Sequence, residues 1–427
     1  MNTLNKKKTI FLIAALFCVN QIFSQVEPTP PSDNSTQFDL AREMLIASGV
    51  TEKLPEYLSR LQGLKNQFLF HIDELKKTQT LTYDFVAEEG LKFLYSGSNT
   101  LQIYSTYQTR IDLALDTHKY NCVSSTLLYL YLMDAAGIEC KPVETPQHAF
   151  CQVYIPTKDG SKPRRVETTN PYGYDPTTKK VDPENVNRYY KVPVKHYAQQ
   201  KCVSPQRAVS LIYLNRVAEC SRKNQMEQAY KLSLDAFKLQ NGDQIALKEL
   251  QGSASNYLLW LGQNKQYSKG LEFSRQFKNE FGLSKDCQTN TNFILSKNLN
   301  NLMERKNFQE AQDLLEQNQD LISQTDYNNL MEVVICNFIS AELAKHPGYK
   351  NSMDLLDKYS DYLPPTKIKA YKTNITRNAA VEIHNSIIPL INSRQFSEAR
   401  KIVENGIEQI GEHSILLNDL RYLKQFE

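Results

Sequence analysis

Two side chains with nucleophilic or acid–base chemistry stand out in the stretch 118–155, a cysteine and a histidine. Cys122 follows Asn121, a good helix-capping residue, and precedes the apolar run VSSTLLYLYLMDAA, which predicts a buried helix ending at Gly137. Thiols at helix N-termini ionise readily, and the N–H groups there can bind an oxyanion. His148, on the next predicted strand, is the candidate base. The pattern favours a cysteine nucleophile paired with a histidine.

A histidine base needs a polar group that orients it, and Glu167 is the candidate. Side chains alternate between faces along a strand. When the run RRVETT pairs back on HAFCQVYI after an Asp-Gly turn, Glu167 falls on the face of His148. A carboxylate there would hold the second imidazole nitrogen. Asn170 is the alternative, as in Cys-His-Asn proteases, although strand parity puts it on the opposite face; Asp175 is a further alternative.

The predicted site has a definite geometry. We expect the sulfur of Cys122 and the imidazole of His148 to lie within about 4 Å of each other. Tyr120 and Asn121 flank the nucleophile and are candidate oxyanion donors. Each residue also has an ordinary structural interpretation: a small core cysteine, an exposed histidine at a strand end, or a solvated carboxylate. The chain order of the three residue types, on a helix start and two strands, favours the site.

The region 38–200 around these residues is predicted to combine helices with a small sheet. Residues 38–118 carry apolar positions at helical spacing and predict a few helices that lead into the site. Between 138 and 170, short runs rich in β-branched and aromatic residues predict a small antiparallel sheet. Cys140 and Cys151 flank the turn of one hairpin, so a disulfide between them is an alternative to two free thiols.

The region 205–427 is predicted to be a repeat of helical hairpins. A large side chain recurs just after a polar turn, with a small residue three positions later. The pairs are Met226 and Ala229, Tyr267 and Gly270, Phe308 and Ala311, Tyr349 and Ser352, and Phe396 and Ala399. The large residues lie 41, 41, 41 and 47 residues apart. A constant period of this size is typical of stacked helical hairpins that resemble tetratricopeptide repeats with longer helices. An irregular helical array is the alternative.

The N-terminus predicts export. Three lysines precede the apolar run TIFLIAALFCV, and Ser24 offers a small residue before a cleavage point, so residues 1–24 read as a signal peptide. Residues 25–37 read as a proline-rich linker. We therefore expect a periplasmic or secreted protein without a stable membrane span. A lipid anchor on Cys18 is the alternative, although Phe17 stands where lipoprotein signals carry a small residue.

Composition removes several classes of partner and cofactor from consideration. Lys and Arg number 50 and Asp and Glu 47, which gives a net charge of +3 and no reason to expect nucleic acid. No cysteine pair has CxxC spacing and no calcium loop of the DxDxDG type is present, so we expect neither a metal nor a cofactor. Seven cysteines remain after the signal peptide, which leaves at least one unpaired within the chain.

Three segments, YNCVSSTLLYLYLMDAAGI, ETPQHAF and VETT, resemble the bacterial transglutaminase-like branch of the papain-like cysteine fold. The resemblance covers residues ~80–175. It implies Cys122 as nucleophile, His148 as base and Glu167 as the orienting acid, on an α+β domain; members of this family also carry tetratricopeptide-like repeats. The family's usual acid is Asp where this chain has Glu, and a Trp often follows the His-Ala pair where this chain has Phe150.

Two functions from different classes follow. The first is an exported cysteine-dependent amide hydrolase or acyltransferase, in which Cys122 forms a thioester and His148 protonates the leaving amine. Water would then give hydrolysis and an amine would give transamidation. The expected substrate is a protein or peptide, with a partner protein on the helical repeats. The second is a catalytically silent transglutaminase-like scaffold that only binds peptide.

Overall fold

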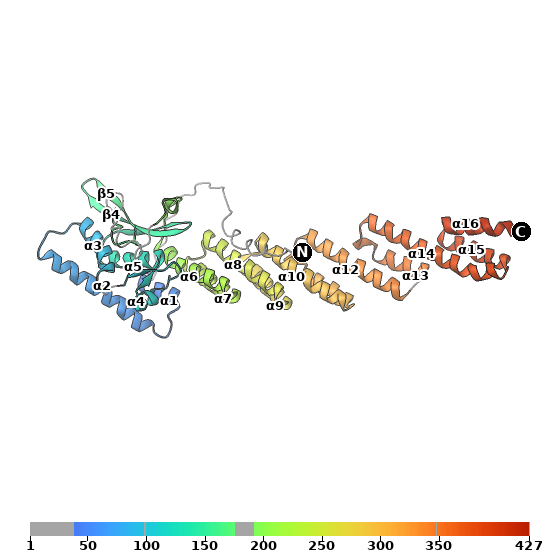
Figure 1. Ribbon diagram of the computed structural model, residues 1–427, viewed down its shortest axis with the longest axis horizontal. Coiled ribbons are helices and arrows are strands. Elements are labelled where there is room, and N and C mark those ends of the chain that lie inside the picture. Colours follow the sequence, from blue (N-terminus) through green and yellow to red (C-terminus); the bar gives the residue numbers. More distant parts are fainter. Residues whose placement is uncertain (1–37, 98–99, 176–191, 347, 427) are drawn as a thin grey trace, which may run out of the picture. The chain divides into compact units, whose positions relative to one another are not determined.

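The computed structural model describes residues 38–97, 100–175, 192–346 and 348–426 (Figure 1). The predicted signal peptide and linker lie outside these residues. Helices dominate, and the longer strands form a small antiparallel sheet near the N-terminal end of the described chain. No helix within the described residues is both long enough and apolar enough to cross a bilayer.

The first helices lead into the site region, as the apolar spacing predicted. They are α1 (Leu40–Ser48), α2 (Leu54–Lys76), α3 (Tyr83–Tyr95) and α4 (Ile111–Thr117). Thr82 caps α3 by accepting a hydrogen bond from the N–H of Phe85 at 3.2 Å. Two short strands, β1 (Ile103–Tyr104) and β2 (Lys119–Tyr120), pair in parallel just before the helix that carries the cysteine.

The central helix is α5 (Cys122–Ala135), and it is buried on all sides, as its uniformly apolar sequence predicted. It packs against α2, α3 and the strands β3 and β4. The sheet has the strand order β5-β4-β3-β6 and is antiparallel throughout. Its strands are β3 (Cys140–Thr145), β4 (His148–Thr157), β5 (Gly160–Val166) and β6 (Lys201–Cys202). The sequence predicted the first three and missed β6.

The register of the β3–β4 hairpin determines whether Cys140 and Cys151 lie directly opposite each other. Cys140 lies opposite Val153 and Cys151 lies opposite Pro142, so the two cysteines are diagonal neighbours rather than a directly opposed pair. Both are free thiols. Burial, and a hydrogen bond with Cys140, raise the pKa of Cys151 well above its usual value. The disulfide that the sequence left open as an alternative is therefore not formed, because the two cysteines are offset by two positions.

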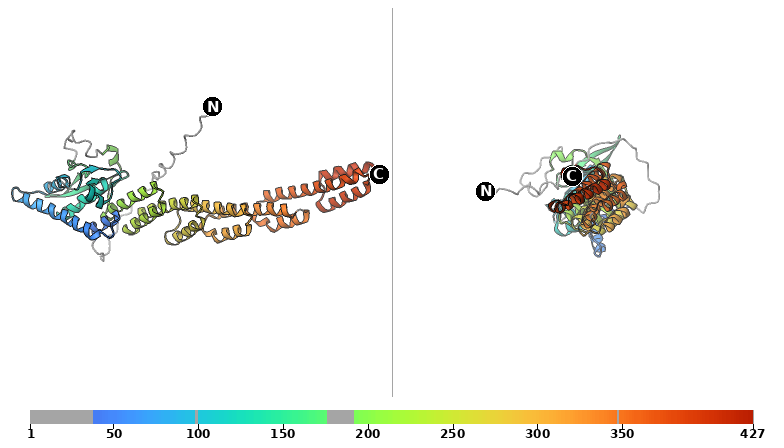
Figure 2. Two further views of the ribbon diagram at one scale, coloured as in Figure 1. Left: turned by 60° about the horizontal axis from the view of Figure 1, so that its bottom comes forward. Right: turned by 90° about the vertical axis from the view of Figure 1, so that its right-hand side faces the viewer.

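From Pro205 onward the described residues form helices joined by short turns, as predicted. The helices are α6 (Pro205–Arg222), α7 (Met226–Leu239), α8 (Gln244–Gln263), α9 (Tyr267–Phe281), α10 (Lys285–Glu304), α11 (Phe308–Gln317), α12 (Gln324–Lys345), α13 (Tyr349–Lys358), α14 (Pro365–Asn392), α15 (Phe396–Ile410) and α16 (Ser414–Leu423). Successive helices contact each other, and α10 also contacts both α8 and α12. In Figure 2 the helices follow one another from green to red toward the C-terminus. Each of the five large residues of the sequence repeat is the first residue of its helix.

Four of the five turns before these helices, those before α7, α9, α11 and α15, share one backbone conformation. Asn224, Lys265, Lys306 and Arg394 each stand two residues before a repeat anchor, and each adopts a left-handed conformation with φ between 58° and 62°. Two of the small repeat residues, Ala311 and Ala399, are fully buried where the next helix approaches. The sequence period therefore corresponds to a repeated turn-and-helix unit, with the positive φ supplied mostly by residues other than glycine.

One side chain ties the sheet to the helices that follow it. Arg207 on α6 donates to both carboxylate oxygens of Glu144 on β3, at 2.8 and 2.7 Å. The same guanidinium donates to Glu249 on α8 at 2.8 and 2.9 Å. Helix α6 also contacts α1 and α5, and Arg216 donates to the carbonyl of Ala47 at 2.5 Å. The first helix of the array is thus packed into the α/β region.

Candidate active site

The helix start places Cys122 at the first position of α5, partly exposed. Asn121 is the cap: its Oδ1 accepts hydrogen bonds from the N–H groups of Val123 at 3.0 Å and Ser124 at 3.1 Å. Ser124 returns a bond, because its Oγ accepts from the N–H of Asn121 at 2.9 Å. This reciprocal capping box fixes the helix end and uses N–H groups other than that of Cys122.

The first residue of β4 brings the histidine to the centre of the site. His148 lies opposite Thr145 across the hairpin turn, and its side chain is only 1% exposed. Its Nε2 lies 2.9 Å from Oε2 of Glu167, whose side chain is 7% exposed. The Cys122 thiol also acts on the imidazole of His148 and helps to raise its pKa. Because Glu167 faces Nε2, Nδ1 is the nitrogen left for the sulfur. The structure thus joins His148 directly to Glu167, and the distance of about 4 Å between the sulfur and the imidazole stays a prediction.

The carboxylate of Glu167 has a hydrogen-bond donor at each available position. Its Oε1 accepts from the N–H of Thr169 at 3.1 Å and from the hydroxyl of Thr169 at 2.7 Å. Its Oε2 accepts from His148 and from the hydroxyl of Tyr197 at 2.7 Å. Four donors match the four lone-pair directions of an ionised carboxylate. A buried carboxylate satisfied in this way stays charged.

Electrostatics follow from these contacts. Burial lowers the pKa of His148, but the hydrogen bonds with Cys122 and Glu167 outweigh burial and raise the pKa to about 10. Burial raises the pKa of Glu167, but the hydrogen bonds from His148, Tyr197 and Thr169 outweigh it, so this pKa lies below the usual value. At neutral pH the site therefore holds an imidazolium between a carboxylate and a cysteine, the charge state in which a histidine can protonate a leaving group.

Buried hydroxyl groups fix the position of Glu167. Thr168, next along the chain, has its Oγ1 3.0 Å from both Ser125 Oγ and Thr126 Oγ1 on α5. Its carbonyl accepts from the hydroxyl of Tyr95 at 2.7 Å. These bonds join α3, α5 and the end of β5 inside the core. The acid is therefore held by the same helix that carries the nucleophile.

A close backbone approach supports the same segment. The N–H of Glu167 donates to the carbonyl of Gly173 at 2.8 Å. A Cβ on Gly173 would lie 1.9 Å from the carbonyl oxygen of Glu167, so only glycine fits here. This glycine lies in NPYGYDPTTKK, which the sequence indicated only as a loop.

The alternative residues lie elsewhere. The hydroxyl of Tyr120 is fully buried and donates to the carbonyl of Thr169 at 3.0 Å, so it is not directed at an oxyanion beside the thiol. Asn121 is used as the helix cap, and its Nδ2 lies 3.4 Å from the carbonyl of Thr106. Asn170 accepts from the N–H of Tyr172 at 2.8 Å in a local turn, and Asp175 pairs with Arg164 at 2.9 Å. The structure places neither of these last two at the imidazole.

Sequence reasoning missed one residue of the site, Tyr197. It belongs to the short 3-10 helix η2 (Val194–Tyr197) within residues 192–202, a segment that we call the strap. The strap ends in β6, which pairs with β3. Its sequence, VPVKHYAQQKC, has neither helical nor strand periodicity. No sequence signal indicated that its tyrosine would return to Glu167.

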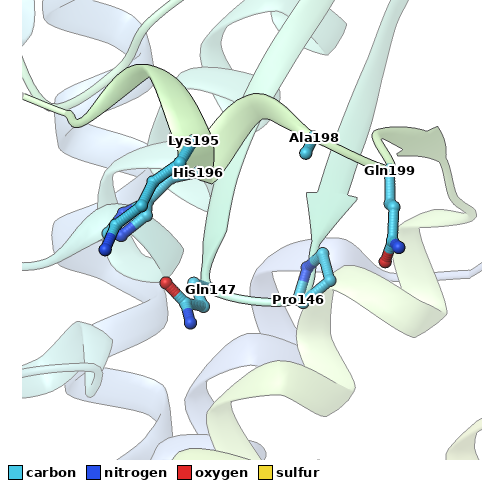
Figure 3. Close-up of a pocket in the computed structure, with 6 residues that line it drawn as sticks. All are labelled: Pro146, Gln147, Lys195, His196, Ala198 and Gln199. Carbon is cyan, nitrogen blue, oxygen red and sulfur yellow. The ribbon is translucent and has the colours of Figure 1, made fainter. Parts of the chain in front are cut away.

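A cavity of about 250 Å³ lies between the strap and the β3–β4 turn that immediately precedes His148 (Figure 3). It is lined by Pro146 and Gln147 of the turn and by Lys195, His196, Ala198 and Gln199 of the strap. Nδ1 of His196 is buried there without a hydrogen-bond partner among the described residues. Elsewhere too, the described part of the chain holds no cluster of side chains suited to a metal ion.

Comparison with protein-family models, with curated proteins and with solved structures finds no match for this chain. The function is therefore inferred from the chemistry of the site.

Proposed function

We propose that this protein is an exported cysteine-dependent amide hydrolase or acyltransferase, with a transglutaminase-like N-terminal domain and tetratricopeptide-like repeats. The observation that carries the proposal is the buried hydrogen bond between His148 and Glu167. Cys122 stands at the start of a capped helix and is one of the groups that raise the pKa of this imidazole. A nucleophile, a base and an orienting acid in this order are the parts needed for acyl transfer.

The proposed reaction has two steps. The sulfur of Cys122 attacks the carbonyl carbon of an amide, and the negative charge on oxygen is stabilised by the N–H of Cys122, which the capping box leaves unused. The imidazolium of His148 gives its proton to the leaving nitrogen, the C–N bond breaks, and a thioester remains. Neutral His148 then takes a proton from water or from an amine, which attacks the thioester and releases Cys122. Glu167 balances the charge on the imidazolium and holds its orientation.

The proposed substrate is a protein or peptide, and the helical array would hold a partner protein. Stacked helical hairpins present long surfaces suited to extended partners. Export is proposed from the residues 1–24 alone.

Thiol labelling tests the proposal. Cys122, Cys220 and Cys336 are all partly exposed, so the last two serve as matched controls for access. At pH 6 to 7, iodoacetamide should modify Cys122 much faster than either control, because a thiolate paired with an imidazolium reacts where ordinary thiols are protonated. Equal rates at all three cysteines would contradict the enzyme.

The silent scaffold is the second candidate, and one observation favours it. His148 is 1% exposed on its side chain, because the strap covers it. A covered site is compatible with a peptide-binding domain that performs no chemistry. Substrate trapping separates the two. Cys122→Ser should retain a bound protein or peptide that the unaltered enzyme releases as product. A scaffold that performs no chemistry would retain the same partner whether position 122 is cysteine or serine.

A further inference from the structure

Tyr197 makes contacts on both sides of the His148–Glu167 pair. Its hydroxyl donates to Oε2 of Glu167 at 2.7 Å, the same oxygen that faces Nε2 of His148 at 2.9 Å. Its ring stands edge-on to the imidazole, with centroids 6.0 Å apart and an interplanar angle of 89°. One residue of the strap therefore both bonds the acid and covers the base.

The ring of Tyr197 is itself held from two directions. It stands edge-on to Phe150, with centroids 5.5 Å apart, and Phe150 stacks on His148 at 6.2 Å. On its other side the guanidinium of Arg165 lies 4.8 Å from the ring centroid and also reaches Phe150 at 5.6 Å. Because β6 fastens the end of the strap to β3, the tyrosine is anchored at both its ring and its backbone.

We propose that Tyr197 is a positioning residue for the reaction at Cys122: its hydroxyl aims Oε2 of Glu167 at the imidazole, and its ring keeps water from that hydrogen bond. The inference rests on the proposed function. A hydrogen bond to a charged group is strengthened when water is excluded. The imidazole must keep one orientation while it gives up and regains its proton, and a carboxylate bonded on both oxygens cannot rotate away.

The simpler alternative is that Tyr197 merely fastens the strap. A fastening residue would affect stability without altering the imidazole–carboxylate bond, so the test must observe that bond directly. The titratable groups shown to act on Glu167 are His148 and Cys151 on β4 and Tyr197 on η2. Arg165 on β5 lies over the ring of Tyr197, and Cys122 on α5 acts on His148.

The proton between Nε2 and Oε2 should give a low-field proton resonance in a one-dimensional NMR spectrum of the full chain. Its absence from His148→Gln and Glu167→Gln assigns it to this bond. In Tyr197→Phe the ring remains but the hydroxyl is lost, so Oε2 becomes a stronger acceptor for His148 and the resonance should move further downfield. In Tyr197→Ala, exchange of this proton with water should rise by about tenfold or more, since a bond to a charged group becomes open to solvent.

Tyr154→Phe is the matched control. Tyr154 lies on β4 and its hydroxyl faces Cys202 at 3.8 Å, well away from the acid, so this variant should leave the resonance unchanged. The outcomes separate two failures. A native protein without any resonance that depends on both His148 and Glu167 would overturn the proposed function together with this inference. The role of Tyr197 alone would be overturned by two results together: a resonance at the same position in Tyr197→Phe and the native protein, and an unchanged rate of exchange of this proton with water in Tyr197→Ala.

Discussion

Two carboxylates, one in each region of the chain, receive several hydrogen bonds and yet differ in their setting. Glu167 in the α/β region accepts from His148, Thr169 and Tyr197, and its side chain is 7% exposed. Glu227 on α7 accepts from Lys231 at 3.0 Å, Lys269 at 2.7 Å and Tyr257 at 3.1 Å, and its side chain is 44% exposed.

Both carboxyl groups have a lowered pKa, but for Glu227 the change means much less for stability. The hydrogen bond from Lys269 is the main cause that brings the pKa of Glu227 to about 2. Water and salt screen this cluster, so exposed pairs of this kind contribute little. At Glu167 water is excluded, and removal of one partner leaves another charge buried. The two carboxylates accept hydrogen bonds from similar numbers of donors. What distinguishes the buried site at Glu167 from the surface ion cluster at Glu227 is exposure to solvent.

The largest expected effect is on the reactivity of Cys122. His148→Ala should slow its alkylation by iodoacetamide at pH 6 by at least about tenfold, because the thiolate loses its cationic partner. Glu167→Gln should slow it less, and Glu167→Asp should retain part of the rate. The double variant His148→Ala, Glu167→Gln should match His148→Ala alone, because Glu167 acts through the histidine. If the fold-decreases in alkylation rate of the two single variants multiplied in the double variant, His148 and Glu167 would act independently of each other.

The two carboxylates can next be compared directly by stability. Glu167→Gln should lower the free energy of unfolding by about 3 kcal/mol, since it leaves an imidazolium buried without its counter-charge. Glu227→Gln, the matched change at the surface, should alter it by less than about 0.5 kcal/mol. Urea unfolding followed by circular dichroism measures both. Similar losses from the two variants would contradict the distinction drawn from exposure.

The pH dependence of stability sharpens the same contrast. His148 has a pKa raised to about 10 in the folded protein, against 6.5 for the ordinary group. The folded state therefore holds this proton more tightly, so the contribution of His148 is complete below pH 6.5 and is lost as the pH rises toward 10.

The stability of the native protein relative to His148→Gln should accordingly fall by about 4 kcal/mol between pH 6 and pH 10. Urea unfolding of both proteins across this range measures the difference. A difference that stays constant with pH would mean that the imidazole is not held in its charged form.

The smallest expected effect lies in the turns of the array. Lys306 has φ of 62°, a conformation that asparagine adopts more easily and that Asn224 already occupies at the equivalent turn. Lys306→Asn should stabilise the protein by up to about 1 kcal/mol, and the reverse change Asn224→Lys should destabilise it by a similar amount. Thermal unfolding measures both shifts. Neither change should affect alkylation of Cys122, because the turns lie outside the α/β region.

Much of the fold could be predicted because it follows from local patterns. The capped start of α5 at Cys122 follows from Asn121 and an apolar run, and the helices from Met226 onward follow from a repeated spacing. The face shared by His148 and Glu167 follows from strand parity, which tolerates small errors in the turn. When side chains alternate along a strand, the face of each residue can be predicted once the strand itself is identified.

Other features depend on contacts between distant segments and gave no local signal. A two-residue strand such as β6 has no measurable period, so the return of Tyr197 to Glu167 could not be predicted. The cysteine pair failed for a different reason. The two cysteines would lie directly opposite each other only if the hairpin turn were centred midway between Cys140 and Cys151. The turn is centred one residue later, between Pro146 and Gln147. A shift of the turn centre by one residue moves the paired positions by two, so Cys140 lies opposite Val153 instead of Cys151.

The four hydrogen bonds that Arg207 donates to Glu144 and Glu249 have a consequence for where the chain can be divided. Only two residues separate β6 from α6. The guanidinium of Arg207 on α6 donates hydrogen bonds to Glu144 on β3 and to Glu249 on α8. A chain cut after residue 203 would leave Glu144 without this partner and would uncover the faces of α1 and α5 that α6 protects. We therefore expect a stable fragment with Cys122 to need the chain through α8, so that the boundary of the folding unit would fall inside the repeats.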